Sequence, residues 1–312
     1  MKILITGATN GMGKGVARAL AACPGVDIVV HGRSGARIAE TVAELSAIAS
    51  PSRISSVRCD LTSLRAVRAC VEELCASHPS LDGVFVNAGL GYAPRREETE
   101  DGLDSHFQVN YLSQFVLTLG LLERLEASPH GGRVVFNATE VGEMRWDDLQ
   151  MKGKWSYEAA IGQGMMAKHL FYRRLHALYA ARDGAKVSCF GYQIPKTVWS
   201  NQIEIIPTPM RAMATVAKWL GQFISIDECG ALMAPLFVES AEETHQRSGR
   251  FLTSKKGQFS EVEKKLPAID DPVQQQRLWD LSLELSSDEQ TRYAAERLVS
   301  PRAIGHQVRH GT

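Results

Sequence analysis

Three closely spaced glycines near the start of the chain have the pattern of a phosphate-binding turn. Gly7, Gly11 and Gly13 follow a short apolar run and precede a helical pattern. Glycine adopts positive φ without strain, and its missing side chain lets backbone N–H groups approach a pyrophosphate. The N-terminus of the following helix adds about half a positive charge at the same place. The turn therefore predicts a dinucleotide site, because the glycines follow a strand and open a helix. Thr9, Asn10 and Met12 complete the predicted contacts of this loop.

The end of the second predicted strand indicates which dinucleotide binds. An NAD site places an acidic residue there, which hydrogen-bonds the ribose 2′-hydroxyl. This chain instead has Arg33 and Ser34 after His31 and Gly32. A guanidinium pairs well with a 2′-phosphate, and a serine hydroxyl adds a hydrogen bond. We therefore expect NADP(H) in preference to NAD(H). The alternative is that Arg33 is only a solvated surface side chain.

Two further polar motifs follow the third and fourth predicted strands. Asp60 comes after the third strand, where its carboxylate is expected to accept a hydrogen bond from the adenine amino group. Asn87 ends the fourth strand, where the backbone passes close to the adenosine ribose. Leu61, Ala88 and Gly89 belong to the same two motifs. Each motif is short, and their order along the chain gives them weight.

Short apolar runs alternate with longer helical patterns along most of the chain. Strands are predicted at 3–6, 27–31, 54–58, 83–87, 133–137, 185–190 and 249–252, and helices at 13–22, 35–49, 64–77, 102–126, 157–182, 210–223 and 227–240. Most of these strands are apolar at their centres, as strands covered on both faces are. The alternation predicts an α/β fold, a single Rossmann-type doubly wound parallel sheet of about seven strands. Residues 1–253 are expected to form this domain. Residues 254–312 are expected to form a helical C-terminal extension, with helices at 272–285 and 287–298, packed on the domain or on a second subunit.

Composition argues against several classes of protein. Lys plus Arg and Asp plus Glu number 35 each, so nothing points to a nucleic-acid or membrane partner. Six cysteines are scattered without a C-x-x-C pair, which favours reduced thiols over disulfides or a metal site. No stretch approaches about 18 apolar residues, and the strand that opens the chain leaves no room for a signal peptide. We therefore expect a soluble cytoplasmic protein that acts on a small molecule.

The order of these motifs resembles the short-chain dehydrogenase/reductase superfamily. The segment 106–115 is similar to its retinol-dehydrogenase-like branch, as are the segments 249–252 and 278–282, and the resemblance covers roughly residues 1–285. It implies a nicotinamide-dependent oxidoreductase whose cofactor contacts the glycine turn and the motifs after the next three strands. It also implies that Asn110 is the family's active-site asparagine, and it allows a homodimer.

The chain departs from the family where the proton is delivered. In this superfamily a serine polarises the carbonyl, a tyrosine donates the proton, and a lysine four residues later lowers the pKa of the tyrosine. Thr139 is the best counterpart of the serine, and Glu140 is either a second polar group or a solvated loop carboxylate. The resemblance places Ile161 at the tyrosine and Met165 at the lysine, so both would line the substrate pocket with apolar surface. Lys168 lies two turns from Ile161 and is expected to face solvent.

Two loops offer candidates for the remaining parts of the site. Tyr192 follows the sixth strand, in the only literal Tyr-x-x-x-Lys of the chain, and is either a replacement acid near the nicotinamide or a chance match. The loop 140–156, with Trp146 among its aromatic and charged residues, is either the substrate wall or an ordinary surface loop. The segment 200–210 is a candidate lid over the cofactor.

These residues favour an atypical reductase. General acid catalysis contributes about 10²–10⁴-fold, whereas positioning of the reactants supplies an effective molarity of about 10⁵ M or more. We therefore expect an NADPH-dependent reductase, in specialised metabolism, of an imine, an iminium ion or a carbonyl that brings its own proton. The alternatives are a catalytically silent NADP(H)-binding pseudoenzyme and a non-redox cyclase or isomerase on the same scaffold.

Overall fold

The computed structural model describes residues 1–139, 142–199, 208–255, 257–262 and 266–299. Within them an eight-stranded sheet has the order β10-β9-β6-β5-β4-β1-β2-β3, and neighbouring strands run parallel except β10, which is antiparallel to β9. The strands are β1 (Lys2–Ile5), β2 (Asp27–Gly32), β3 (Ile54–Arg58), β4 (Gly83–Val86), β5 (Gly132–Asn137), β6 (Val187–Tyr192), β9 (Phe251–Lys255) and β10 (Gln258–Glu261). The predicted doubly wound parallel sheet is confirmed.

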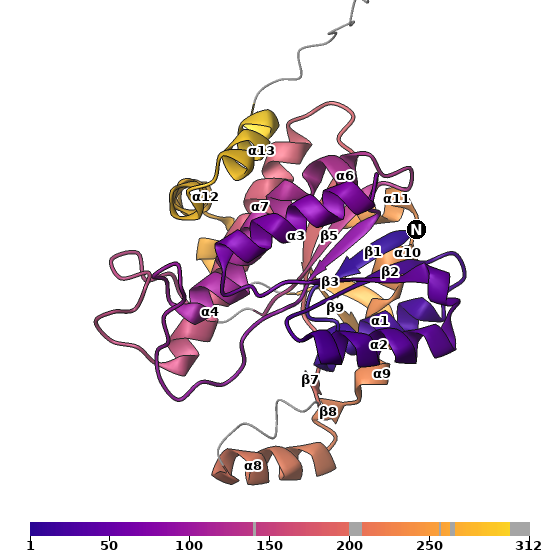
Figure 1. Ribbon diagram of the computed structural model, residues 1–312. Coiled ribbons are helices and arrows are strands. Elements are labelled where there is room, and N and C mark those ends of the chain that lie inside the picture. The colour runs from indigo at the N-terminus through magenta and orange to yellow at the C-terminus, as the bar shows by residue number, and fades with distance from the viewer. Residues whose placement is uncertain (140–141, 200–207, 256, 263–265, 300–312) are drawn as a thin grey trace, which may run out of the picture.

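Helices cover both faces of the sheet (Figure 1). One face carries α1 (Gly11–Ala21), α2 (Gly35–Ile48), α9 (Ile226–Met233) and α10 (Pro235–Val238); the other carries α3 (Leu64–Ser77), α5 (Ser113–Gly120) and α7 (Tyr157–Ala180). Shorter helical segments are Pro51–Arg53, α4 (Ser105–Phe107), Gln108–Leu112, α6 (Leu122–Glu126) and α11 (Ala241–Arg247). Both faces of the sheet are buried, which explains the apolar strand centres in the sequence.

Polar side chains fix where the main helices begin. Asn10, Ser34, Ser63 and Ser156 are the N-caps of α1, α2, α3 and α7, and each side chain accepts a hydrogen bond from a backbone N–H of the first turn. A cap of this kind stabilises a helix by about 1 kcal/mol. Three of these helices start directly after a strand or a short loop, so their N-termini lie at the carboxyl edge of the sheet.

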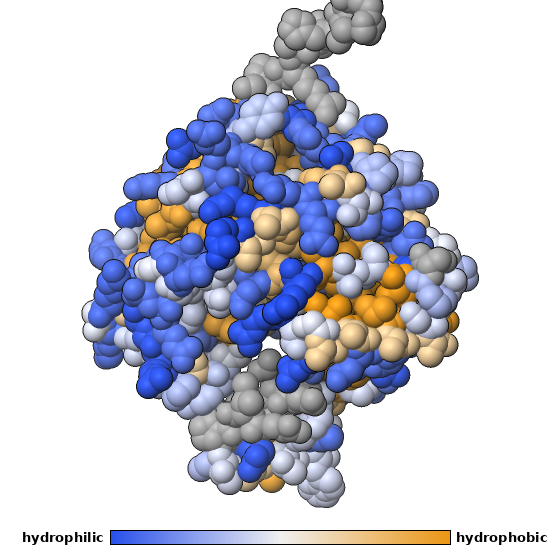
Figure 2. All heavy atoms as spheres, in the orientation of Figure 1, coloured by the Kyte–Doolittle hydropathy of each residue, from blue (hydrophilic) through white to orange (hydrophobic). Residues whose placement is uncertain are grey.

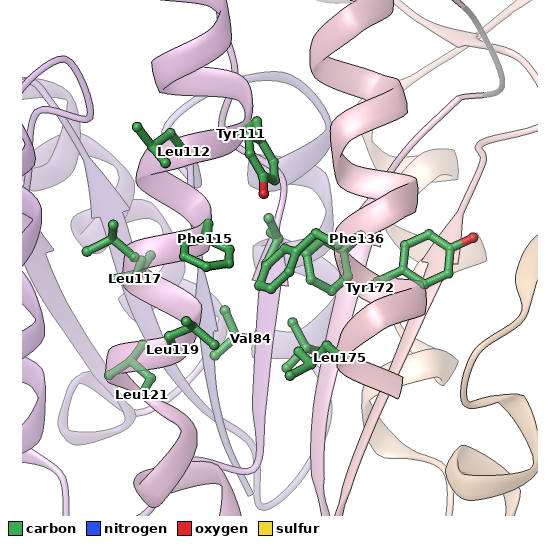
Figure 3. Packing of buried hydrophobic residues seen from close by; sticks show 14 of the residues in the cluster. Val84, Tyr111, Leu112, Phe115, Leu117, Leu119, Leu121, Phe136, Tyr172 and Leu175 are labelled. Atoms are coloured by element: carbon green, nitrogen blue, oxygen red, sulfur yellow. The ribbon is translucent and has the colours of Figure 1, made fainter. Parts of the chain in front are cut away.

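An aromatic cluster fills the core between α5, α7 and the sheet (Figure 3). The rings of Phe115 and Phe171 have centroids 4.9 Å apart, and Phe136 of β5 lies 5.4 Å from Phe171 in an edge-on arrangement. Such aromatic pairs add about 0.5–1.5 kcal/mol beyond the area they bury. The cluster fixes α5 and α7 against the sheet, and α7 carries the positions at which the family's tyrosine and lysine are expected.

The C-terminal helices complete this core. Trp279 of α12 (Pro272–Ser286) packs edge-on against Phe115, with ring centroids 5.4 Å apart, and Leu298 of α13 (Glu289–Val299) is buried in the same cluster. The predicted division after residue 253 falls inside β9, and β10 extends the same sheet. The helical extension therefore begins later in the described residues, with the short helix at Pro267–Asp270, and it packs on the domain.

A small lobe extends from the edge of the domain (Figure 1). It contains two parallel strands, β7 (Thr197–Val198) and β8 (Phe223–Ile224), with α8 (Thr208–Trp219) between them in sequence. The ring of Trp199 packs edge-on against that of Phe223, 5.2 Å between centroids.

Candidate functional site

The glycine turn has the shape that a pyrophosphate needs. Gly7 and Gly11 adopt φ of 67° and 53°, in the left-handed region that favours glycine. A Cβ added to Gly13 would clash with the carbonyl oxygen of Gly7 and would lie 2.6 Å from Nδ2 of Asn87. The turn is therefore closed in a conformation that admits no side chain at these positions. Asn10 accepts a hydrogen bond from Gly11 N at 2.8 Å, and Met12 packs against the neighbouring core.

Hydrogen bonds join this turn to the end of β4. Thr6 Oγ1 accepts from the backbone N–H groups of Asn87 and Ala88, at 2.9 and 3.0 Å, and Asn87 Nδ2 donates to the carbonyl of Thr6 at 2.9 Å. Asn137, at the end of β5, donates to Oδ1 of Asn87 at 3.3 Å. The network connects the carboxyl ends of three strands at the point where the strand order reverses, the usual ligand-binding edge of such a sheet.

The end of β2 presents cations to the same edge. Arg33 and Ser34 are exposed, and Ser34 Oγ accepts from the backbone N–H of Arg37. A Cβ added to Gly32 would lie 2.8 Å from Cγ2 of Thr9, so the glycine turn packs on the end of this strand. The sequence analysis missed two cations of this region, because nothing in their spacing marks them. Arg37 and Lys14 line a cleft of about 600 Å³ together with Thr9, Asn10 and the carboxylates Glu40 and Glu228, and Lys14 pairs with Glu44 at 2.6 Å.

The carboxylate of Asp60, after β3, already accepts hydrogen bonds from its own loop. Asp60 Oδ1 accepts from the backbone N–H and the hydroxyl of Thr62, at 3.0 and 2.8 Å. Leu61 is buried, and its carbonyl accepts from Ser113 Oγ at 2.7 Å. These bonds fix the position of the Asp60 carboxylate beside the place where the adenine is expected.

Asn110 is the centre of a π-helical segment, Gln108–Leu112, and is fully buried. Its Oδ1 accepts from the backbone N–H of Leu90 at 2.6 Å, and a Cβ added to Gly89 would lie 2.8 Å from that oxygen. Its Nδ2 has no hydrogen-bond partner among the described residues. Single π-turns are frequent at functional sites. The side chain of Asn110 thus holds the loop after β4 in place and leaves one buried donor free.

Ile161 and Met165 lie half-buried in the first half of α7. This part of α7 packs closely on its surroundings: a Cβ on Gly142 would clash with Gly162, and a Cβ on Gly164 would lie 3.1 Å from Cβ of Asn110. The loop after β5 and the π-segment therefore both meet α7 next to the two apolar positions. Neither position carries a group that can exchange a proton.

Lys168 is buried, and the expectation that it faces solvent is wrong. Its side chain is 1% exposed, and Nζ donates to the carbonyl of Asn137 at 3.1 Å. The desolvation that accompanies burial lowers the pKa of Lys168 to about 8. The helix face that carries Lys168 points at the end of β5, where a main-chain carbonyl satisfies the amine.

His169 makes the second contact between α7 and the loop after β5. Its Nε2 lies 3.1 Å from the carbonyl oxygen of Thr139, and its Nδ1 lies 3.1 Å from the hydroxyl of Tyr172. Burial lowers the pKa of His169 to about 4, so the ring is neutral at pH 7. Because Nε2 donates to a carbonyl, Nδ1 accepts from Tyr172. Thr139 is half-buried in this held loop, whereas Glu140 lies outside the described residues.

Tyr192 is enclosed in the core on the other face of the sheet. It is 1% exposed, and its hydroxyl lies 2.7 Å from Oγ of Ser254. Desolvation raises the pKa of Tyr192 to about 12, and the hydrogen bond to Ser254 opposes that rise. The hydroxyl is already paired and is shielded from solvent, which argues against its role as a proton donor.

The loop 142–156 is attached to the C-terminal extension through Trp146. Its Nε1 donates to Oε1 of Gln274 at 3.3 Å, and the guanidinium of Arg277 lies 4.5 Å from the centroid of a Trp146 ring. Trp146 therefore holds the loop on α12.

Eight residues of the candidate lid, 200–207, lie outside the described residues.

The sequence analysis missed an aromatic cluster at the start of α7. The ring of Tyr157 lies 5.3 Å from that of Tyr92 and 5.9 Å from that of His106, and Trp155 lies 5.9 Å from His106. His106 Nε2 is 3.0 Å from the carbonyl oxygen of Gly91. Two buried nitrogens of the cluster, His106 Nδ1 and Trp155 Nε1, have no hydrogen-bond partner among the described residues. No regular spacing connects these residues in the sequence, so periodicity gave no signal.

Comparisons with known proteins agree with this geometry. Residues 1–152 match the family described as short chain dehydrogenase. The chain is 32% identical over 289 residues to polyprenol dehydrogenase of Mus musculus, covering 91% of this chain and 83% of that protein. It is 30% identical over 295 residues to retinol dehydrogenase 14 of Homo sapiens, covering 90% and 84%. Among solved structures, the Pseudomonas aeruginosa RhlG/NADP active-site complex aligns with a TM-score of 0.64 at 22% identity, covering 82% of this chain and 95% of that one.

The predicted cytoplasmic location is wrong. The polyprenol and retinol dehydrogenases among these relatives are membrane-associated proteins. None of the helices that the structure describes combines the length and the apolar character needed to cross a bilayer. The sequence argument failed because it looked only for spanning or targeting segments.

Proposed function

The chain belongs to the short-chain dehydrogenase/reductase superfamily, in its retinol-dehydrogenase-like branch, and we propose that it is an NADPH-dependent reductase of an acceptor that needs no proton from a tyrosine. The observation that carries the proposal is the pair Ile161 and Met165. They lie on α7 beside the loop after β5, where the family's proton-donating pair is expected.

The residues at the carboxyl edge of the sheet fit a phosphorylated dinucleotide. The glycine turn leaves room for a pyrophosphate at the N-terminus of α1, since side chains are excluded at Gly7 and Gly13. Arg33 at the end of β2 is exposed and no carboxylate follows that strand, which favours a 2′-phosphate over a free ribose hydroxyl. When bound, NADPH supplies a hydride to the acceptor carbon.

The groups around α7 restrict the acceptor. Lys168 and His169 make hydrogen bonds to the main chain of β5 and of the loop after it. These bonds position Thr139, and they use the two side chains for contacts within the protein. An alkoxide formed beside Ile161 and Met165 would find no group at these positions that can give it a proton, and a buried charge that stays unneutralised is very costly. An iminium carbon that accepts hydride passes its C=N electron pair to nitrogen and becomes a neutral amine. A carbonyl with a neighbouring phenol brings its own proton.

The aromatic cluster at the start of α7 supports a cationic acceptor. Tyr92 and Tyr157 are half-exposed rings packed edge to face, next to the apolar positions of α7. The face of a tyrosine ring attracts a cation with about 0.5–2 kcal/mol. This surface favours an iminium ion over a neutral ketone. The relatives are named as dehydrogenases of polyprenol and retinol, which are alcohols. Oxidation of an alcohol needs a base to remove the hydroxyl proton. Ile161 and Met165 do not provide one.

Paired substrates test the proposal. NADPH oxidation is followed with an N-alkyl cyclic iminium ion and with a neutral ketone of the same ring size. We expect turnover with the iminium and background with the ketone. Background rates with the iminium and with a phenol-flanked ketone would overturn the proposal.

Light scattering of the full chain in solution tests the homodimer that the family resemblance allows.

A second candidate is an NADP(H)-binding protein without turnover. It is favoured by the pairing of Lys168, His169 and Tyr192 with other protein groups, which leaves none of them free to exchange a proton. This second candidate is identified if calorimetry detects NADPH binding and neither the iminium ion nor the ketone causes NADPH oxidation. Product formation with unchanged NADPH identifies a cyclase or isomerase.

A further inference from the structure

The helix α8 carries an exposed apolar stripe. Met213, Val216, Trp219 and Leu220 are 73%, 58%, 86% and 62% exposed. Their spacing of three and four residues places them along one side of the helix. The face of the molecule in Figure 2 is mostly hydrophilic, with smaller apolar areas between charged side chains. Four of the nine large hydrophobic side chains that are exposed in the described residues lie within the eight residues 213–220.

The charged residues of α8 lie on its opposite side. Arg211 and Lys218 are seven residues apart, and Nζ of Lys218 lies 4.0 Å from the centroid of a Trp199 ring, at the base of the lobe. Lys218 thus faces the domain, and the apolar stripe lies on the other side of the helix. No Asp or Glu occurs between residues 205 and 226. Arg211 and Lys218 are thus the only charged residues of this sequence segment, although the chain as a whole has no net charge.

We propose that α8 docks the protein on an anionic lipid surface. A helix with an apolar face and basic residues lies in the interface plane, with its apolar side chains in the headgroup region. Arg211 and Lys218, on the other side of the helix, attract anionic headgroups over roughly the 10 Å range of screened charges. A tryptophan at the end of the helix suits this boundary, because its ring is apolar and its N–H is polar. A second protein copy fits less well, since four side chains offer less apolar area than the roughly 800 Å² per partner that a stable dimer buries.

The position of the lobe links docking to the site. Trp199, Lys218 and Phe223 line the same cleft as Asn10 and Arg37 at the glycine turn. A protein docked through α8 would therefore hold this cleft close to the lipid surface. The balanced overall charge, from which we expected no membrane partner, conceals this local basic and apolar element.

Vesicle sedimentation of the full chain tests the proposal. The probes are vesicles of phosphatidylcholine alone and of phosphatidylcholine with an equal share of phosphatidylglycerol. We expect binding to the anionic vesicles, weaker binding at high salt, and a loss of at least about tenfold in the double variant Trp219→Ser with Leu220→Gln. Val273→Gln is the control, because it also replaces an exposed apolar side chain, 73% exposed, but on α12.

Several outcomes would overturn docking through α8. One is no binding of the wild type to either vesicle, and another is equal binding by the double variant. A third is a protein mass that halves in the double variant, which would assign the stripe to a second copy. NADP⁺ binding, measured by calorimetry in the same variants, should not change, so this proposal and the proposed function fail separately.

Discussion

The amine of Lys168 lies 3.1 Å from the carbonyl oxygen of Asn137, inside a core from which solvent is excluded. One hydrogen bond holds an amine whose charged form is strongly desolvated. The same contact fixes the end of β5, two residues before Thr139. Lys168 therefore positions the loop, and its burial lowers the stability of the protein at neutral pH.

Replacing this lysine should stabilise the protein at pH 7 and destabilise it at high pH. The unfolded chain keeps the Lys168 proton up to about pH 10.5 and the folded chain loses it near its pKa of about 8. Between these values the unfolded state binds more protons, so wild-type stability rises with pH. The lowered pKa of Lys168 corresponds to a destabilisation of the folded state by about 3 kcal/mol at pH 7. The hydrogen bond from Lys168 to Asn137 offsets about 1 kcal/mol of this cost. Lys168→Met should be more stable by roughly 2 kcal/mol below pH 8 and slightly less stable above pH 10.5.

Denaturant unfolding across this pH range measures the difference. Lys152→Met, at an exposed position, is the control and should show a pH-independent difference near zero. A Lys168→Met difference that also stays constant with pH would show that the amine keeps its ordinary pKa in the folded state.

Restoring the family's pair should create ketone reduction. Ile161→Tyr with Met165→Lys places a phenol and an amine one turn apart on α7, beside the loop after β5. We expect NADPH-dependent reduction of a neutral ketone to rise by about 10²–10⁴-fold. Ile161→Phe with Met165→Lys adds similar bulk without the hydroxyl and should remain at background. A double restoration that binds NADPH but gains no ketone activity would mean that α7 does not present these positions to the substrate.

Gly13→Ala should abolish cofactor binding. The added Cβ would clash with the carbonyl oxygen of Gly7, and the turn would have to open. We expect the Kd for NADP⁺ to rise at least about 100-fold by calorimetry, equivalent to about 2.7 kcal/mol. Gly35→Ala is the control, since a Cβ there meets nothing within 4 Å. Thermal melting of both variants separates loss of the turn from loss of the fold.

Arg33→Ala should change the choice of cofactor. Loss of a charge-assisted contact with a 2′-phosphate costs about 1.5–3 kcal/mol, which corresponds to roughly 10–150-fold in Kd. NAD⁺ has no such phosphate, so its Kd should stay the same. Arg65→Ala, at a side chain that is 83% exposed and paired with Glu100, should affect neither nucleotide. Equal losses for both nucleotides would contradict a 2′-phosphate contact.

The hydroxyls of Tyr111 and Ser282 should contribute measurably to stability. They lie 2.6 Å apart and are fully buried, and Ser282 Oγ also donates to the carbonyl of Leu278. Tyr111 therefore donates to Ser282 and connects the π-segment with α12. Tyr111→Phe should lower the free energy of unfolding by about 1–2 kcal/mol, measured with denaturant. Tyr293→Phe, at an exposed tyrosine, should leave it unchanged; a loss below about 0.3 kcal/mol for Tyr111→Phe would show that water replaces the bond.

Much of the fold followed from local pattern. The strands were predicted within about three residues, because apolar runs between helical patterns are a strong signal for buried parallel strands. The pattern missed β7, β8 and β10, which have two, two and four residues. The region 102–126 was predicted as one helix, but it is interrupted by the π-segment around Asn110, whose side chain bonds to the loop after β4.

The candidate site was predictable where backbone shape defines it. The glycine turn depends on residues within seven positions, so its sequence is sufficient. The environments of Lys168 and Tyr192 depend on partners far along the chain, Asn137 and Ser254, at separations of 31 and 62 residues. No periodicity contains that information, which explains why Lys168 was expected in solvent.

The contribution of α12 to the central core has a consequence for synthesis. Trp279 covers the rings of Phe115 and Phe171, which precede it by more than 100 residues. While a ribosome is still making the chain, every strand of the sheet has emerged before this covering helix. A nascent chain therefore exposes an aromatic surface until the last helices appear, and folding factors that recognise such surfaces should bind it during that interval.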